Sequence, residues 1–97
     1  MRTEKHLQKY LQKHCGLAGI LCHKMESRSA RGWPDMLCLF RGQAIFVELK
    51  SPSGTGRLHP LQIVCIADIN NHGGDARVVS TPEQADELIA EMLDVKS

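Results

Sequence analysis

The sequence predicts an α/β fold in which helices flank a mixed β-sheet, with the elements in the order α, β, β, β, α, β, α. Three observations lead to this prediction. The length of 97 residues suits one hydrophobic core, and 42% hydrophobic with 24% charged residues is the composition of a folding chain. Short apolar runs in the middle of the chain lie between segments of helical periodicity. We therefore expect residues 1–97 to form a single domain.

The amino-terminal helix is predicted over residues 3–15. Four residues share the i, i+3, i+4, i+7 spacing of a buried helical stripe: Leu7, Tyr10, Leu11 and His14. Three basic residues fall on the opposite side of this helix: Lys5, Lys9 and Lys13. This segment is amphipathic and charged, and no run of 18 apolar residues occurs anywhere, so we expect an unexported protein without a membrane span.

The next three elements are predicted to be strands. Residues 20–27 suit a short strand, and residues 35–40 and 43–50 are mostly apolar runs. Arg41 and Gly42 divide these two runs, which is typical of a hairpin with a two-residue loop. The third strand is apolar on both faces, which predicts a central strand covered by helices on both sides.

A second helix is predicted over residues 61–72, with Pro60 at its start and Gly73 just beyond its end. It is apolar almost all round. Residues 76–79 form the last predicted strand. Because strand, helix and strand follow one another, a right-handed crossover should place this strand parallel to residues 43–50.

The last predicted helix begins at residues 81–84, where Thr-Pro-Glu-Gln has the pattern of a capping box. Five apolar residues of this helix are expected to face inward: Ala85, Leu88, Ile89, Met92 and Leu93. They would close the core from the carboxyl-terminal side.

Glu48 stands out because it lies within the apolar central strand, where a carboxylate is costly unless it is paired, hydrogen-bonded or bound to a metal. With a two-residue loop, opposite residues of the hairpin have numbers that sum to 83, so Asp35 faces Glu48. Two carboxylates side by side repel each other unless a cation lies between them. Lys50 should project from the same face, two residues beyond Glu48.

Two polar residues of the helices are predicted to approach the same place. Glu4 falls on the apolar stripe of the first helix and should point inward, and Gln62 shares a face with the apolar residues of the second helix. Each residue of this set also has an ordinary structural interpretation, such as a favourable charge at a helix start or a solvated side chain. Together, however, five polar groups could meet at one end of the sheet.

The net charge of +1 is distributed unevenly. Residues 1–60 contain ten Lys and Arg against four Asp and Glu, a sum of +6, whereas residues 61–97 contain two against seven, a sum of −5. This division suggests one face that attracts polyanions. The four cysteines form no Cys-x-x-Cys pair, and buried thiols are favoured over disulfides or zinc: Cys15, Cys22, Cys38 and Cys65.

The residues also resemble a known family. Gly-Trp-Pro-Asp at 32–35, then twelve residues, then Glu-Leu-Lys at 48–50, resembles the PD-(D/E)xK nuclease signature. Residues 57–62 and 71–74 are similar to the continuation found in the VRR-NUC family of that superfamily. The resemblance extends from Glu4 to about Val79. It is close to a whole standalone domain of the kind that bacteriophages encode, and the nuclease domain of the Fanconi-associated nuclease is a relative.

The resemblance implies a restriction-endonuclease-like fold and metal-dependent hydrolysis of DNA. Asp35 and Glu48 would be metal ligands together with the Leu49 carbonyl, and Glu4 would join them directly or through water. Lys50 would be the catalytic lysine, and Gln62 would support the site. Mg²⁺ or Mn²⁺ suits these oxygen donors, because such ions prefer carboxylates and carbonyls in near-octahedral geometry.

For DNA contacts, the lysines at 5, 9 and 13 are candidates, although a solvated lysine face is equally favoured. Further candidates lie near the predicted site, along with the loop at residues 51–56: Arg28, Arg31, Arg41 and Arg57. Small viral members of the family imply a homodimer that resolves four-way (Holliday) junctions, acting in the cytoplasm of a bacterial host. The alternatives are a flap or nicking nuclease, a catalytically silent DNA-binding module, and a structural subunit of a larger complex.

Overall fold

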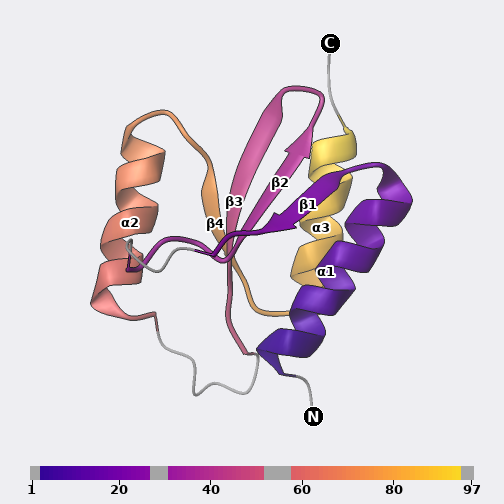
Figure 1. Ribbon diagram of the computed structural model, residues 1–97. Coiled ribbons are helices and arrows are strands. Elements are labelled where there is room, and N and C mark those ends of the chain that lie inside the picture. Colours follow the sequence, from indigo (N-terminus) through magenta and orange to yellow (C-terminus); the bar gives the residue numbers. More distant parts are fainter. Residues whose placement is uncertain (1–2, 27–30, 52–57, 95–97) are drawn as a thin grey trace.

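The computed structural model describes residues 3–26, 31–51 and 58–94, and it confirms the predicted order of elements (Figure 1). The elements are α1 (Glu4–Ala18), β1 (Leu21–Lys24), β2 (Met36–Phe40), β3 (Gln43–Leu49), α2 (Pro60–Asn71), β4 (Ala76–Val79) and α3 (Pro82–Leu93). The four strands form one sheet in the order β1-β2-β3-β4. The first three strands are antiparallel and β4 is parallel to β3, so the predicted mixed sheet is confirmed.

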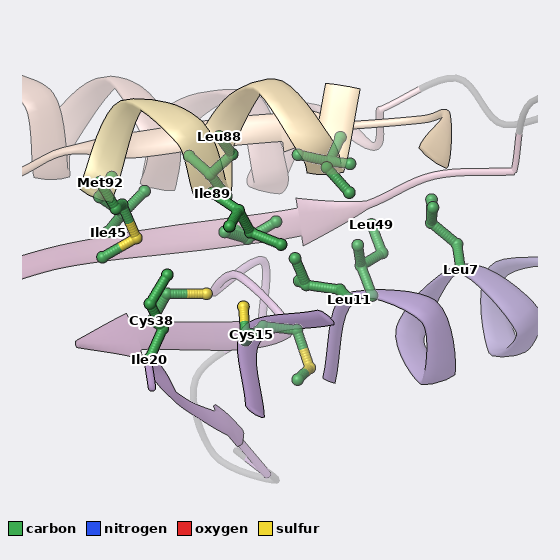
Figure 2. Packing of buried hydrophobic residues seen from close by; sticks show 14 residues of the cluster. Leu7, Leu11, Cys15, Ile20, Cys38, Ile45, Leu49, Leu88, Ile89 and Met92 are labelled. Atoms are coloured by element: carbon green, nitrogen blue, oxygen red, sulfur yellow. The ribbon is translucent and has the colours of Figure 1, made fainter. Parts of the chain in front are cut away.

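The helices lie on both sides of the sheet. In Figure 1, α1 and α3 stand together on one side, and α2 stands on the other side next to β4. The main core lies between the sheet and the α1–α3 pair, where Figure 2 shows its side chains meeting. Labelled members of this core are Leu7, Leu11, Cys15, Ile20, Cys38, Ile45, Leu49, Leu88, Ile89 and Met92. None of the helices in the described part of the chain is both long and apolar enough to span a membrane.

Helix α1 is longer than predicted. It begins after Thr3, whose side chain accepts a hydrogen bond from the His6 amide, and it ends at Gly19, whose φ of 79° is in the left-handed region. Helical geometry therefore continues one turn beyond residue 15. Two residues of the predicted stripe, Tyr10 and His14, are only half-buried and stack on each other at a ring separation of 4.1 Å.

The hairpin forms as predicted. Arg41 and Gly42 both have positive φ, 48° and 83°, as a type I′ turn requires. The ladder pairs Phe40 with Gln43 and Met36 with Val47, which is the register whose residue numbers sum to 83. Strand β1 is shorter than the predicted 20–27, since it ends at Lys24.

The α2 side of the sheet is less covered than predicted. No residue of α2 is buried, and Leu61, Ile63 and Val64 are exposed, because α2 lies against β4 and does not extend over β1 and β2. Leu39 of β2 is therefore partly exposed on that face. Leu93, predicted to face inward, is also exposed, since it is the last residue of α3.

Only half of the predicted capping box of α3 forms. The Thr81 hydroxyl accepts a hydrogen bond from the Gln84 amide at 3.1 Å, as expected. The Gln84 side-chain carbonyl, however, accepts from the amide of Ser80, not from that of Thr81. A complete capping box is found instead at α2, where it bears on the site described next.

Candidate active site

Glu48 is the buried carboxylate around which the candidate site is built. It lies near the end of β3 with 2% of its surface exposed. Its Oε2 accepts a hydrogen bond of 2.8 Å from Nε2 of Gln62 and lies 3.8 Å from Nζ of Lys50. Its Oε1 is buried and has no hydrogen-bond partner among the described residues. One strong acceptor is therefore left without a donor, which is costly in a folded protein.

The pKa of Glu48 is raised to about 8. Burial is the largest cause, because it disfavours the charged form, and the negative charge of Asp35 is the next. The ammonium group of Lys50 acts in the opposite direction but does not offset the two. The charged form of Glu48 is therefore disfavoured as the site stands, and a bound cation would favour it.

Asp35 lies one residue before β2, where the hairpin register brings it opposite Glu48. Its Oδ2 accepts a hydrogen bond of 3.0 Å from the backbone amide of Leu49, and its own carbonyl accepts one of 2.7 Å from the Met25 amide. Asp35 is thus fixed by both neighbouring strands. The hairpin register therefore brings the two carboxylates side by side, as predicted. Their proximity is reflected in the pKa of Glu48, which the charge of Asp35 raises.

Lys50 directly follows β3, and its backbone amide donates to the carbonyl of Val79 at 3.0 Å. This bond continues the parallel β3–β4 pairing by one residue. The Lys50 side chain is 15% exposed and stays on the same face as Glu48, as the alternation of side chains along a strand predicts. Its ammonium group is therefore placed beside the carboxylates but remains open to solvent.

Gln62 is oriented by the start of α2. Its Oε1 accepts a hydrogen bond of 2.8 Å from the His59 amide, and Nδ1 of His59 accepts one of 3.1 Å from the Leu61 amide. Because the capping box occupies the carbonyl oxygen of Gln62, the amide nitrogen is the group that faces Glu48. The predicted inward direction of Gln62 is consistent with this arrangement.

Glu4 differs from its prediction. It is the first residue of α1 and is exposed, because the first helical turn lies at the rim of the sheet rather than over the core. It lines an open cleft of about 610 Å³ that also reaches Asp35 and Leu49. Its negative charge contributes to raising the pKa of Glu48, so it remains electrostatically linked to the site.

The cleft has basic and amide groups along its walls. Its lining residues are Glu4, Lys5, Gln8, Lys9, Gln12, Lys24, Asp35 and Leu49. Two of the three predicted lysines, Lys5 and Lys9, are among them, whereas Lys13 is exposed further along α1. Lys24 is a residue that sequence reasoning missed; it ends β1 opposite Met36, directly beside the position of Asp35.

The structure does not gather the predicted arginines around the cleft. Arg31 is exposed beside the start of α2, where it lines a separate hollow with Gln62. Arg41 lies at the hairpin turn over the ring of Phe40, roughly 20 Å from the level of Asp35 at ~3.3 Å per residue. The hairpin therefore holds Arg41 away from the site. Arg28, Arg57 and residues 52–56 lie outside the described residues.

The donors of this site fit a divalent cation that prefers oxygen ligands. Asp35 and Glu48 provide two carboxylates, and the unpartnered Oε1 of Glu48 is an acceptor that a cation could bind. A second set of potential metal ligands lies elsewhere in the fold and consists of the thiols of Cys15, Cys22 and Cys38, which suit softer metals. Hard-cation chemistry is therefore expected at the Asp35–Glu48 end of the sheet.

A mixed sheet with helices on both sides, carrying two carboxylates and a lysine at one end, defines a nuclease-type domain with a restriction-endonuclease-like fold. No family model matches the sequence, and no curated protein does. Among solved structures, a VRR-NUC domain superposes with a TM-score of 0.79 at 31% identity, covering 92% of this chain and 97% of that one. The chain belongs to the VRR-NUC domain family, whose members generally use divalent metal ions.

Proposed function

We propose that this protein is a Mg²⁺- or Mn²⁺-dependent endodeoxyribonuclease. The observation that carries the proposal is the buried Glu48 carboxylate, which lies opposite Asp35 and keeps one oxygen without a partner among the described residues. A structural carboxylate would be expected to have all of its acceptors paired. An unpaired oxygen beside a second carboxylate is explained if the site binds a cation.

Asp35 and Glu48 would hold the ion, with the carbonyl of Leu49 as a further ligand and Glu4 joining directly or through water. When bound, such an ion lowers the pKa of a water molecule and offsets the charge that develops on the phosphate. Gln62 keeps the Glu48 carboxylate in place through Oε2, so that Oε1 stays available. The amide of Leu49 does the same for Asp35.

Lys50 would act on the reacting groups. Its ammonium group is 3.8 Å from Glu48 and partly open to solvent, so it can donate to an attacking water or to a phosphate oxygen. Either interaction strengthens as negative charge develops in the transition state. The orientation of this side chain depends on the hydrogen bond from the Lys50 amide to the Val79 carbonyl, which fixes the end of β3.

DNA would enter along the cleft. Lys5, Lys9 and Lys24 line its walls and could contact phosphates, while Glu4 and Asp35 lie at its acidic end. Phosphate contacts position a duplex without reading its sequence, and their strength falls with salt. This arrangement supports recognition of DNA structure in preference to sequence.

We further propose that the enzyme is structure-selective and resolves four-way junctions as a homodimer. What supports a dimer is the apolar surface on the α2 side of the sheet, where Leu21, Leu39 and Trp33 are exposed. Leu21 and Leu39 pair across β1 and β2 and therefore share this face. A two-fold contact between such faces would join two active sites, one for each of two cut strands.

The test compares labelled four-way junction, flap, nicked duplex and plain duplex in the presence of Mg²⁺ or Mn²⁺. We expect the wild type to cut the junction faster than the other substrates, and Lys50→Ala to cut it more slowly by about 10³-fold or more. Equal cutting of all substrates would contradict structure selectivity, and preferential cutting of flaps or nicks would favour those alternatives.

DNA binding and assembly state complete this test. Binding without cutting would indicate a silent DNA-binding module, and a failure to bind DNA at low salt would indicate a structural subunit. Leu39→Asp should convert a dimer to a monomer in sedimentation experiments, whereas a substitution at exposed Leu17 on α1 should leave the dimer intact.

A further inference from the structure

Three of the four cysteines converge in the core, at a place distinct from the carboxylates. Cys15 comes from α1, Cys22 from β1 and Cys38 from β2, and their three Sγ atoms lie within 4.8 Å of one another. Cys22 and Cys38 are directly opposite in the β1–β2 ladder, with their sulfurs 3.9 Å apart. Figure 2 shows the sulfurs of Cys15 and Cys38 facing each other inside the core.

We propose that Cys15, Cys22 and Cys38 form a binding site for a thiophilic divalent cation, with Zn²⁺ as its natural occupant. In a tetrahedral zinc site the Zn–S distance is about 2.3 Å, which puts two sulfur ligands about 3.8 Å apart. The Cys22–Cys38 separation of 3.9 Å already matches this value. The other two pairs need only a small contraction to reach it.

The fourth coordination position would lie on the side of Cys22. Cys15 and Cys38 are completely buried, but Cys22 is only half-buried, so the open side of the cluster faces the protein surface. The neighbouring residue His23 belongs to the opposite face of the strand, because side chains alternate along β1. A water molecule or an external ligand would therefore complete the site.

Cys15, Cys22 and Cys38 are all free of disulfides, so each thiol can bind a metal once it has lost its proton. Binding of Zn²⁺ would release these thiol protons, so the affinity should rise with pH.

Cys65 is an internal reference for these thiols. It lies on α2, is half-buried like Cys22, and donates a weak hydrogen bond to the carbonyl of Arg31 at 3.5 Å. It belongs to no compact set of potential ligands among the described residues. A variant at Cys65 is therefore a matched control, because it removes one thiol but leaves the three clustered cysteines intact.

A bound ion would add a link between three elements, of which β1 and β2 are already joined by their backbone ladder and α1 packs on them through the apolar core. Helix α1, which carries Glu4, Lys5 and Lys9 of the cleft, would be tied to β1 and β2. The ligand chemistry separates the two metal sites, because thiolates select soft cations and the carboxylates select Mg²⁺ or Mn²⁺. The cysteine site would therefore stabilise the fold rather than take part in hydrolysis.

The experiment titrates the fully reduced protein with Cd²⁺, as a spectroscopic probe, and follows the ultraviolet sulfur-to-cadmium charge-transfer band. Competition with Zn²⁺ then gives the zinc affinity. We expect one equivalent of Cd²⁺ to bind to the wild type and to Cys65→Ala. Cys22→Ala should weaken binding by at least about 100-fold, since even outer-shell changes at metal sites cost 10–100-fold.

Thermal unfolding with and without Zn²⁺ provides a second measurement. The midpoint should rise with Zn²⁺ in the wild type and in Cys65→Ala but not in Cys22→Ala or Cys22→Ser, two changes at a half-buried position that the fold should tolerate. Absence of a charge-transfer band in the wild type, or a band of equal strength in Cys22→Ala, would overturn the proposal. So would a reduced protein that ignores Cd²⁺ but forms a Cys22–Cys38 disulfide with oxidised glutathione.

Discussion

Two clusters of the molecule contain the same charged groups, two carboxylates and one cation, in opposite circumstances. The first consists of Asp35, Glu48 and Lys50, at the open end of the β2–β3 hairpin, away from its turn. The second consists of Asp75, Glu91 and Arg77, where β4 lies next to α3. In the second cluster the Arg77 guanidinium donates to both oxygens of each carboxylate, and all three side chains are at least one-third exposed. In the first, Glu48 is buried and Lys50 reaches only one of its oxygens.

The pKa shifts of the two clusters show what this difference means. Hydrogen bonds from Arg77 lower the pKa of Glu91, because its charged form is fully paired. Burial, and after it the negative charge of Asp35, raises the pKa of Glu48 to about 8, because both disfavour its charged form. Charges that satisfy one another stabilise a surface, whereas a buried carboxylate with a free acceptor indicates a site that is completed by a ligand. The predictions below test that distinction.

The largest effect is expected on catalysis. Asp35→Asn and Lys50→Ala should each lower Mn²⁺-dependent cleavage of a labelled junction by about 10³-fold or more, because each removes charge that acts on the reacting groups. Glu91→Gln is the matched control and should cut at the wild-type rate. If Glu91→Gln lost as much activity as Asp35→Asn, the two clusters would not differ in function.

The second effect concerns stability and pH in the metal-free protein. The pKa of Glu48 is raised from 4.5 to about 8 in the folded protein. Between these two pH values Glu48 therefore keeps its proton in the folded protein but has lost it in the unfolded chain. The free energy of unfolding should therefore fall as pH rises from about 5 to about 8, by up to roughly 5 kcal/mol. Urea unfolding at several pH values would measure it.

Glu48→Gln should flatten this dependence, since an amide does not titrate. Glu91 should act with the opposite sign, because its lowered pKa contributes stability that is lost as pH falls through the acidic range. If the free energy of unfolding of Glu48→Gln depended on pH as steeply as that of the wild type, the titration of Glu48 would not be the cause of this dependence.

A smaller effect is expected from Gln62→Ala. This change removes the amide that holds Glu48 and also the capping interaction of α2, so metal affinity should fall about 10–100-fold. Gln84→Ala is the control, because Gln84 occupies the equivalent position of α3 but lies away from the carboxylates. Calorimetric titration with Mn²⁺ should show weaker metal binding in Gln62→Ala than in Gln84→Ala. If both variants lost the same affinity, helix capping alone would explain the effect.

The smallest effect is expected from Arg77→Ala. Exposed ion pairs contribute little, so the free energy of unfolding should fall by about 1 kcal/mol or less, and less still at high salt. Cleavage should not change. A loss of several kcal/mol would show that the paired cluster is more than a solvated surface network.

Much of the site could be predicted from the sequence because hairpin geometry is strict. A two-residue loop fixes the register, and the register places Asp35 opposite Glu48 and leaves Lys50 on the same face. The β1 boundary is less constrained by the pattern, so the end of the strand and the position of Lys24 beside the cleft could not be recognised.

Other features depend on tertiary contacts that the pattern does not contain. Helix α2 is apolar almost all round, so its sequence could not show which face would stay exposed. His59 is an uncommon capping residue, and the capping box that orients Gln62 was therefore missed. Glu4 falls on the apolar stripe by periodicity, but the first turn of α1 extends past the sheet, which leaves it in the cleft.

The most direct test is Mn²⁺ binding, measured by electron paramagnetic resonance on the wild type, Glu48→Gln and Glu91→Gln. We expect site-bound Mn²⁺ in the wild type and in Glu91→Gln, and its loss in Glu48→Gln. Retention of the same bound signal in Glu48→Gln would contradict the assignment of the buried carboxylate as the centre of the metal site.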